Sequence, residues 1–213
     1  AGDAVGIAAA AERARRDAET RQCAEREERG QRGGLADAQA QHFGAVGLEQ
    51  DVLHAEARGA DPDRVTVIAN GVDADAFTPE PPDPALRQRY GLEGKFVFGY
   101  VSNMDHPREN QELLVEATAR LLKRGRKVAC LIVGDGKRKD EVEKIARKAR
   151  VGSAVVFTGR VPHDEVKGHY AILDAFVVPR RDERTSRTVT PLKPYEAMAM
   201  ERPLVVSDLP ALT

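Results

Sequence analysis

The sequence predicts an α/β fold with a doubly wound, Rossmann-like parallel sheet, and three observations support this. Short apolar runs rich in β-branched and aromatic residues recur between positions 96 and 206. Segments with apolar residues at helical spacing separate these runs, and glycine or proline stands where the runs end. Strands that alternate with helices form a parallel sheet, because each right-handed crossover returns the chain in the same direction.

Five strands are expected, and the near-continuous apolar character of the longer runs is typical of strands buried on both faces. They are predicted at residues 96–101, 128–133, 155–157, 175–178 and 204–206. Helices are predicted around residues 113–121, 142–149, 163–173 and 194–200. A doubly wound sheet usually has a sixth strand, so we expect this sheet to be incomplete at its C-terminal end.

The first 60 residues differ in composition from the rest of the chain. They hold few large apolar side chains, and none between Ile7 and Leu35. Such a stretch can favour helix locally but cannot bury a core, so we predict a polar helical or disordered segment, or a foreign remnant. A strand signal at 64–69 and a proline-rich linker follow. The expected division is therefore residues 1–60, 61–94 and 95–213.

Composition excludes several classes of function. The formal net charge of −1 gives no global basic field that would indicate a nucleic-acid partner. Two cysteines cannot form a disulfide framework, which favours a reducing, cytoplasmic location. The chain has no apolar run of about 18 residues that could span a membrane. Its five histidines are scattered, so we expect surface or capping histidines and no metal site.

Polar loops follow the first and the fourth predicted strand, whose carboxyl ends would flank the reversal in the strand order 3-2-1-4-5-6. The first loop covers residues 102–108, and the second, residues 179–187, has four arginines within eight residues. Because arginine matches phosphate oxygens bidentately, a phosphorylated ligand is predicted between the loops. The alternative is a solvated loop whose charges partly cancel.

The segment after the second loop leads into a helix. Pro191 and Pro194 lie near its start, where the missing amide hydrogen of proline costs nothing. The free amides and the dipole of the first turn favour an anion there. Glu196 lies one turn inside and could accept hydrogen bonds from a vicinal diol such as a ribose; its alternative role is to offset the positive helix end.

Four motifs in this order resemble the retaining glycosyltransferases of the GT-B fold, family 4. They are Val67–Asp73 with Phe77, Gly134–Gly136, Phe157–Pro162 and Pro191–Ala199. The resemblance implies the C-terminal, donor-binding domain of a two-domain enzyme that uses a nucleotide sugar, expected to be a UDP-sugar, without a further cofactor. The most similar pattern is that of bacterial exopolysaccharide enzymes. It implies a glycan or lipid-linked acceptor, with peripheral contact at the cytoplasmic face of the membrane as an option.

The resemblance also assigns roles to residues. Glu196 matches the acid that holds the ribose hydroxyls, and Thr188 falls where the family has an acid that contacts the donor sugar. Asn103 and Glu109 fall at the positions of a diphosphate-binding arginine and lysine. Further contacts to the donor nucleotide and its phosphates are expected from Arg108, Arg180, Arg181, Thr190, Pro191, Leu192 and Lys193, and contacts to the base from Gly159, Arg160 and Val161.

The fragment by itself is expected to bind donor without transferring sugar, and no catalytic residue is assigned. Two alternatives remain: a nucleotide-sugar epimerase, which shares the two-domain fold, and a non-catalytic nucleotide-binding module. A dinucleotide oxidoreductase is disfavoured because Ser102-Asn103-Met104-Asp105 stands where a Gly-x-Gly-x-x-Gly loop would be needed. Glu201 occupies the position of a helix-ending glycine in the family, which we interpret as a matter of stability.

Overall fold

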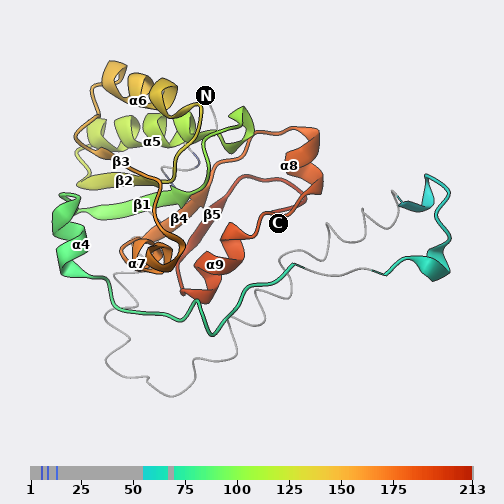
Figure 1. The fold of residues 1–213 in the computed structure, drawn as a ribbon. Coiled ribbons are helices and arrows are strands. Elements are labelled where there is room, and N and C mark those ends of the chain that lie inside the picture. The colour runs from blue at the N-terminus through green and yellow to red at the C-terminus, as the bar shows by residue number, and fades with distance from the viewer. Residues whose placement is uncertain (1–5, 7–8, 10–12, 14–54, 67–69, 213) are drawn as a thin grey trace.

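The computed structural model describes residues 6, 9, 13, 55–66 and 70–212 (Figure 1). Most of the polar segment predicted at 1–60 therefore lies outside the described residues. So does the 67–69 part of the strand predicted at 64–69. Of its described part, Arg64 ends the 3-10 helix η1 (Pro62–Arg64), and Val65 and Thr66 are not in a strand.

A single parallel sheet forms the centre of the described residues. Its strands are β1 (Phe96–Val101), β2 (Val128–Val133), β3 (Val155–Gly159), β4 (Ala175–Val178) and β5 (Leu204–Val206). They are arranged in the order β3-β2-β1-β4-β5, and every pairing is parallel. The predicted fold class and strand order are thus confirmed, and only the third strand runs two residues further than expected.

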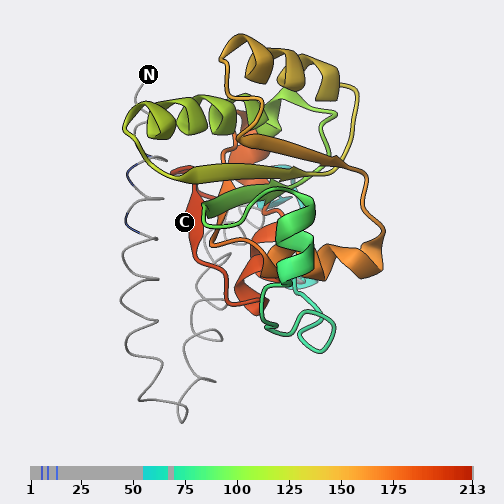
Figure 2. The same cartoon turned by 90° about the vertical axis from the view of Figure 1, so that its left-hand side faces the viewer.

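Helices cover both faces of the sheet, as a doubly wound fold requires. Figures 1 and 2 show α5 (Gln111–Lys123) and α6 (Lys139–Lys148) on one face. The other face carries α4 (Pro84–Arg89), α7 (Val166–Ala171) and α9 (Lys193–Ala199). Two short 3-10 turns, η2 (Pro107–Glu109) and η3 (His163–Glu165), precede α5 and α7. The remaining α-helix of this part of the chain, α8 (Arg184–Thr188), lies within the arginine-rich loop, where no helix was predicted.

The core is formed mainly by the strands and the helix faces turned toward them. All six residues of β2 and all four of β4 are buried. On the face that α7 covers, Tyr100, Tyr170 and Phe176 are buried and in ring contact. Burying a side chain of this size contributes roughly 1.5–3 kcal/mol, so this aromatic group is a main support of the sheet.

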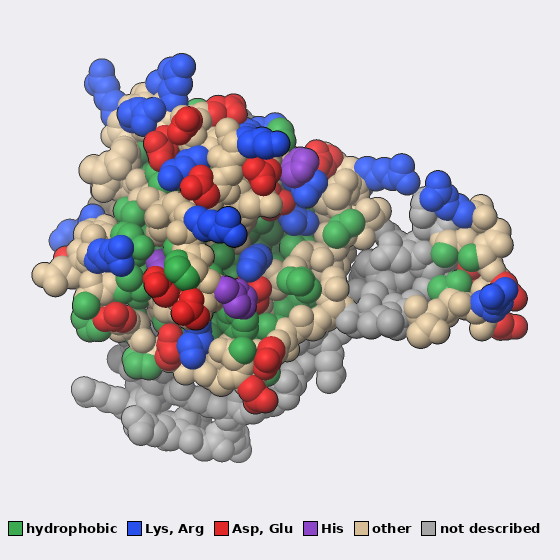
Figure 3. All heavy atoms as spheres, in the orientation of Figure 1, with side chains coloured by type: hydrophobic (Ala, Val, Ile, Leu, Met, Phe, Trp, Pro, Cys, Tyr) green, Lys and Arg blue, Asp and Glu red, His purple; other side chains and the backbone are tan. Residues whose placement is uncertain are grey.

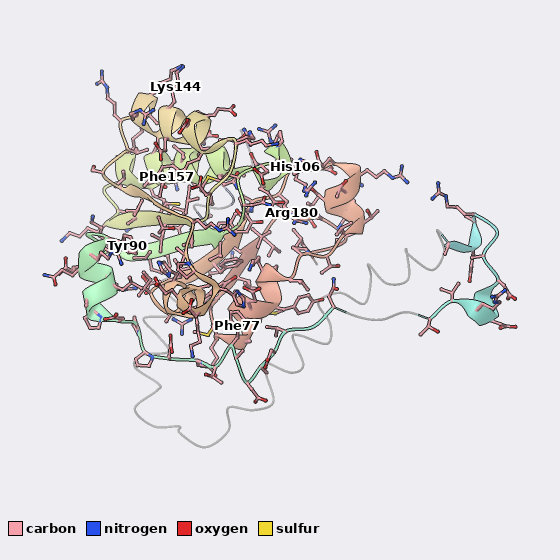
Figure 4. The ribbon with its side chains drawn as sticks, in the orientation of Figure 1. Phe77, Tyr90, His106, Lys144, Phe157 and Arg180 are labelled. Atoms are coloured by element: carbon pink, nitrogen blue, oxygen red, sulfur yellow. The ribbon has the colours of Figure 1, made fainter. Side chains whose placement is uncertain are left out.

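The linker before β1 is fixed to the domain by one aromatic side chain. A turn begins at Asp73, whose carbonyl accepts the Phe77 amide at 2.9 Å and whose carboxylate accepts the amides of Asp75 and Ala76. This turn directs Phe77 inward, where it is buried against the ring of Tyr170 (Figure 4).

The expectation of surface or capping histidines is wrong for His169. This side chain is 2% exposed and lies between α4 and α7. Its Nε2 is 3.0 Å from the Tyr90 hydroxyl, and its Nδ1 is 2.9 Å from the carbonyl oxygen of Glu165. Since a carbonyl only accepts, Nδ1 carries the proton and Nε2 accepts from Tyr90. The residue is a packing element that joins two helices; His106 and His163 are exposed, as expected.

Candidate donor-binding site

The carboxyl ends of β1 and β2 are held together by their loops. The Ser102 amide donates to the Val133 carbonyl at 3.0 Å, and the Met104 amide donates to the Asp135 carbonyl at 2.9 Å. Gly134 has φ 131°, and a Cβ added there would lie 2.0 Å from the Ser102 carbonyl oxygen. Only glycine permits this approach, so the Gly-Asp-Gly motif sets the position of the loop after β1.

The loops that follow β1 and β4 meet, as the strand order predicts. The Arg181 amide donates to the Arg108 carbonyl at 2.9 Å. The Arg180 guanidinium lies 3.2 Å from the Glu109 carboxylate and 3.2 Å from the Val189 carbonyl oxygen. Arg180 therefore joins three segments: the loop after β1, its own loop after β4, and the stretch that leads to α9. Figure 4 labels Arg180 on the loop after β4 and His106 on the loop after β1.

Glu109 stands at the centre of this contact and is only 5% exposed. Its Oε2 accepts the Tyr100 hydroxyl, and its Oε1 lies 3.2 Å from both Arg108 Nε and Arg180 Nη2. Burial, and then the Glu109 charge, raise the pKa of the Tyr100 phenol far above its usual range, so the hydroxyl stays protonated and donates. One buried acid thus orients two arginines.

The outer arginines also have acidic partners. Arg181 donates to Glu112, which also accepts from Arg138 at 3.1 Å. Arg187 forms a two-point contact with Asp182. Figure 3 shows basic and acidic side chains intermixed over the face seen in the orientation of Figure 1, without a continuous basic surface. The outer arginines Arg181 and Arg187 are thus charge-compensated, and Arg180 and Arg181 lie where the loops after β1 and β4 meet.

Glu196 lies in the first turn of α9 and is 8% exposed. Its Oε2 accepts the Tyr170 hydroxyl at 2.8 Å. Lys193 Nζ contacts both carboxylate oxygens, at 3.0 and 3.1 Å. Burial, and then Glu196, raise the pKa of the Tyr170 phenol far above its usual range, so this hydroxyl too remains a donor. The carboxylate is held by a buried phenol on one side and a half-buried lysine on the other.

The remaining predicted residues lie along the same edge of the sheet. Thr188 ends α8 and donates to the Arg184 carbonyl, while the Thr190 carbonyl accepts from Asn70 at 3.3 Å. Asn103 is exposed, and its carbonyl accepts from Gln111 at 3.0 Å. Pro191 is buried and Leu192 is 48% exposed, so the stretch before α9 presents an apolar side chain to solvent.

The loop predicted to contact the base lies on the β3 side of the crevice. Gly159 has φ 72°, and its carbonyl accepts the Gly134 amide at 3.0 Å, which joins this loop to the Gly-Asp-Gly motif. Arg160 is exposed and Val161 packs against the core. β3 is separated from β1 by one strand, so this loop lies roughly 10 Å from the phosphate loops, a distance that a nucleotide can bridge.

Sequence reasoning missed three buried polar groups that support the crevice. They are Tyr100, Tyr170 and Gln111, whose side-chain amide donates to the Ser102 hydroxyl at 3.1 Å. A tyrosine inside an apolar strand run requires a partner for its hydroxyl, and this signal could have identified Tyr100. The partners themselves lie on other elements and cannot be inferred from local spacing.

The described part of the chain offers no group of three or more His, Cys, Asp or Glu side chains that could hold a metal ion. Among the same residues, no helix has the length and apolar character needed to cross a membrane. A groove of about 350 Å³ between α5 and α6 is lined mainly by apolar side chains, including Leu113, Val115 and Ile145, and at one end by Glu112, the partner of Arg181.

Comparisons with known proteins find glycosyltransferases among the relatives of this chain. The chain is 37% identical, over 112 residues, to the GDP-mannose-dependent alpha-(1-6)-phosphatidylinositol monomannoside mannosyltransferase of Mycolicibacterium smegmatis, covering 52% of this chain and 29% of that protein. It is 30% identical to the alpha-D-kanosaminyltransferase of Streptomyces kanamyceticus, covering 68% of this chain and 36% of the relative. The chain thus spans about a third of the length of these relatives.

Solved structures show the same fold. Anabaena HepE in complex with UDP and glucose superposes with a TM-score of 0.62 at 22% identity, over 78% of this chain and 44% of that one. The C-terminal domain of the Francisella tularensis group 1 glycosyl transferase LpcC gives a TM-score of 0.54 at 22% identity, over 66% of this chain and 72% of that domain. The family model for glycosyl transferases group 1 matches residues 95–213, more than half of the sequence. The chain belongs to the glycosyl transferases group 1 family.

Proposed function

We propose that residues 95–212 bind the nucleotide-sugar donor of a glycosyltransferase reaction. The diphosphate would lie between the loops after β1 and β4, and the ribose would bind Glu196. The observation that carries this proposal is the Arg180 guanidinium, which is 3.2 Å from Glu109 and 3.2 Å from the Val189 carbonyl. These contacts support the proposal, because they bring the cationic loop and the segment that leads to Glu196 together beyond the carboxyl ends of β1 and β4.

The chemistry of such a site would be electrostatic. As the bond between sugar and phosphate breaks, negative charge grows on the departing nucleoside diphosphate, and fixed cations near it lower the barrier. Arg108 and Arg180 are held in place by Glu109, and Arg181 and Lys193 lie further out and are more exposed. These four residues would bind and orient the phosphates.

Ribose binding requires a rearrangement at Glu196. In the structure Lys193 Nζ contacts both carboxylate oxygens. A carboxylate has about four acceptor positions, and the Tyr170 hydroxyl uses one of them. When the lysine moves away, both oxygens can accept from the two ribose hydroxyls, and the released ammonium group can contact a phosphate.

The finer properties of the reaction are part of the same proposal. A UDP-sugar is the donor expected from the sequence, but the M. smegmatis relative is named for GDP-mannose, so both nucleotides need testing. Transfer with retention to a glycan or lipid-linked acceptor, in bacterial cell-surface glycan synthesis on the cytoplasmic side, is expected from the family resemblance. The donor is expected to bind without a metal or another cofactor, and transfer is expected to need an acceptor domain as well.

Calorimetric titration of the 213-residue chain with UDP and with GDP tests the proposal. We expect one of them to bind and Glu196→Gln to weaken that binding about tenfold, which corresponds to roughly 1.4 kcal/mol for hydrogen bonds to a charged acceptor. Glu143→Gln is the matched control, because Glu143 lies on α6, outside the crevice. Heat from neither nucleotide, or equal affinity of the Glu196→Gln variant and the wild type, would contradict the proposal.

A further inference from the structure

A row of four aromatic side chains runs through the core beneath the crevice. The ring centroids of Phe77 and Tyr170 are 6.1 Å apart, those of Tyr170 and Phe176 are 5.3 Å apart, and those of Phe176 and Tyr100 are 5.7 Å apart. The two tyrosines and Phe176 are at most 1% exposed. Contacts of this kind restrict the rings, so the two hydroxyl groups are held in fixed positions.

Each of these hydroxyls donates to a different acid of the crevice. The Tyr170 hydroxyl donates to Glu196 Oε2 at 2.8 Å, and the Tyr100 hydroxyl donates to Glu109 Oε2. In Glu109 the other oxygen, Oε1, is thereby turned toward Arg108 and Arg180. The row of rings thus carries two hydrogen bonds, one from Tyr170 to the acid proposed for the ribose and one from Tyr100 to the acid that holds the arginines.

We propose that Tyr170 and Tyr100 are positioning residues, each for recognition of one half of the nucleotide; this rests on the proposed function. Tyr170 orients Glu196 for the ribose hydroxyls. Tyr100 orients Glu109, which in turn fixes Arg180 for the diphosphate. If the carboxylate had no fixed donor, ordering it when the nucleotide binds would reduce the binding free energy. The phenol hydroxyls hold the carboxylates in place beforehand, so this loss is avoided.

Phe77 extends this arrangement to the linker. It is the only one of the four rings outside the segment 96–212, and it is placed by the turn at Asp73. Its edge-on contact with Tyr170, at an interplanar angle of 81°, connects the linker to the residue that orients Glu196. A change in the linker should therefore affect the hydrogen bond between Tyr170 and Glu196 more than the one between Tyr100 and Glu109.

The variants Tyr170→Phe and Tyr100→Phe test the proposal, since each removes one oxygen and keeps the row of rings. For the nucleoside diphosphate that the wild-type chain binds, dissociation constants are measured for the ribonucleotide, its 2′-deoxy analogue and the corresponding monophosphate. The first ratio, 2′-deoxy to ribo, reports recognition of the ribose. The second ratio, monophosphate to diphosphate, reports recognition of the terminal phosphate.

We expect Tyr170→Phe to lower the ratio of 2′-deoxy to ribo dissociation constants about fivefold, which corresponds to the loss of one hydrogen bond, and to leave the monophosphate-to-diphosphate ratio unchanged. Tyr100→Phe should lower the monophosphate-to-diphosphate ratio about fivefold and leave the 2′-deoxy-to-ribo ratio unchanged. Each variant is the control for the other, because a general loss of packing would change both ratios together. Two variants that change both ratios equally, or neither, overturn the inference alone. A wild-type chain that binds neither UDP nor GDP overturns the proposed function and this inference with it.

If either variant does not fold, the wild-type chain labelled with 3-fluorotyrosine gives the same decision by ¹⁹F NMR. The chain has four tyrosines, and the signals of Tyr90 and Tyr195 are assigned by single replacements with phenylalanine. The nucleoside alone should shift one of the two remaining signals, and inorganic pyrophosphate alone should shift the other. Both ligands shifting the same signal, or neither shifting any, would overturn the inference.

Discussion

Lys193 contacts both carboxylate oxygens of Glu196, and replacing this lysine with methionine separates the two roles that the structure gives it. While the ammonium group contacts Glu196, it uses the acceptor oxygens that the ribose hydroxyls would need. In the bound state it would be released toward the phosphates. Lys193→Met keeps most of the aliphatic length of the side chain and removes only the charge.

The size of the effect follows from exposure and distance. The contacts are 3.0 and 3.1 Å long, but the Lys193 side chain is 35% exposed and the Glu196 side chain 11%. Solvent screening at such exposure limits an ion pair to about 1 kcal/mol, or about a fivefold change in an equilibrium constant. A charge-assisted hydrogen bond to phosphate contributes about 1.5–3 kcal/mol, so its loss costs roughly tenfold or more in affinity.

The assay compares the nucleoside with its diphosphate by calorimetry. We expect Lys193→Met to bind the nucleoside up to about fivefold more tightly, while the advantage of the diphosphate over the nucleoside falls about tenfold. Lys144→Met is the control, because Lys144 is an exposed lysine on α6, away from the crevice (Figure 4). Nucleoside affinity that is unchanged or weaker in Lys193→Met would refute the idea that the lysine competes with ribose.

Three further predictions concern stability. Glu201 follows α9 and has a left-handed backbone conformation, with φ 53°, which glycine adopts without strain. Glu201→Gly should therefore raise the unfolding free energy by about 1 kcal/mol, as measured by urea denaturation. Gly134→Ala should lower the unfolding free energy by about 3 kcal/mol or more, because the added Cβ would lie 2.0 Å from the Ser102 carbonyl oxygen. Gly152→Ala is the control, because nothing lies within 4 Å of a Cβ added there. Equal urea midpoints for the two variants would contradict this prediction. Burial raises the pKa of the Cys130 thiol to about 12 from 9.0, so above about pH 9 the unfolded chain loses this proton first. The wild type should then lose about 1.4 kcal/mol more stability per pH unit than Cys130→Ala, in denaturation measured at several pH values; parallel pH profiles would rule this out.

The sheet could be predicted because its strands carry their own signal. β1 and β2 are near-continuous apolar runs ended by polar or glycine residues, and both begin and end where expected. β3 extends through Gly159 because Gly159 pairs with the end of β2, which is a tertiary contact. α8 was missed because Arg-Thr-Ser-Arg-Thr has no apolar periodicity, and α4 because its Asp-Pro start lies in a proline-rich stretch.

The crevice was predicted in outline but not in its internal contacts. Strand order brings the loops after β1 and β4 together, and that order follows from general rules for parallel sheets. From the sequence, Glu109 was identified only as the residue that stands in place of a phosphate-binding lysine. In the structure it is the acid that orients Arg108 and Arg180. Its role depends on Tyr100 and on a loop more than 70 residues away, and no local pattern contains that information.

Charge compensation within the crevice determines which of its cations can serve a ligand. Residues 102–112 and 179–196 together hold six Lys and Arg and six Asp and Glu, so the loops exert no net field that would attract a distant anion. A diphosphate must instead replace acids that already pair with these cations. That exchange is costly at Arg180, whose side chain is 10% exposed beside an acid at 6%, because a buried charge would lose its partner. It is cheaper at Arg181, which is 48% exposed, and at Lys193, which is 35% exposed, because water screens the partner left behind. Arg180 therefore keeps Glu109 as its partner and would meet the diphosphate from a fixed position, while the more exposed Arg181 and Lys193 can exchange their acid partners for phosphate.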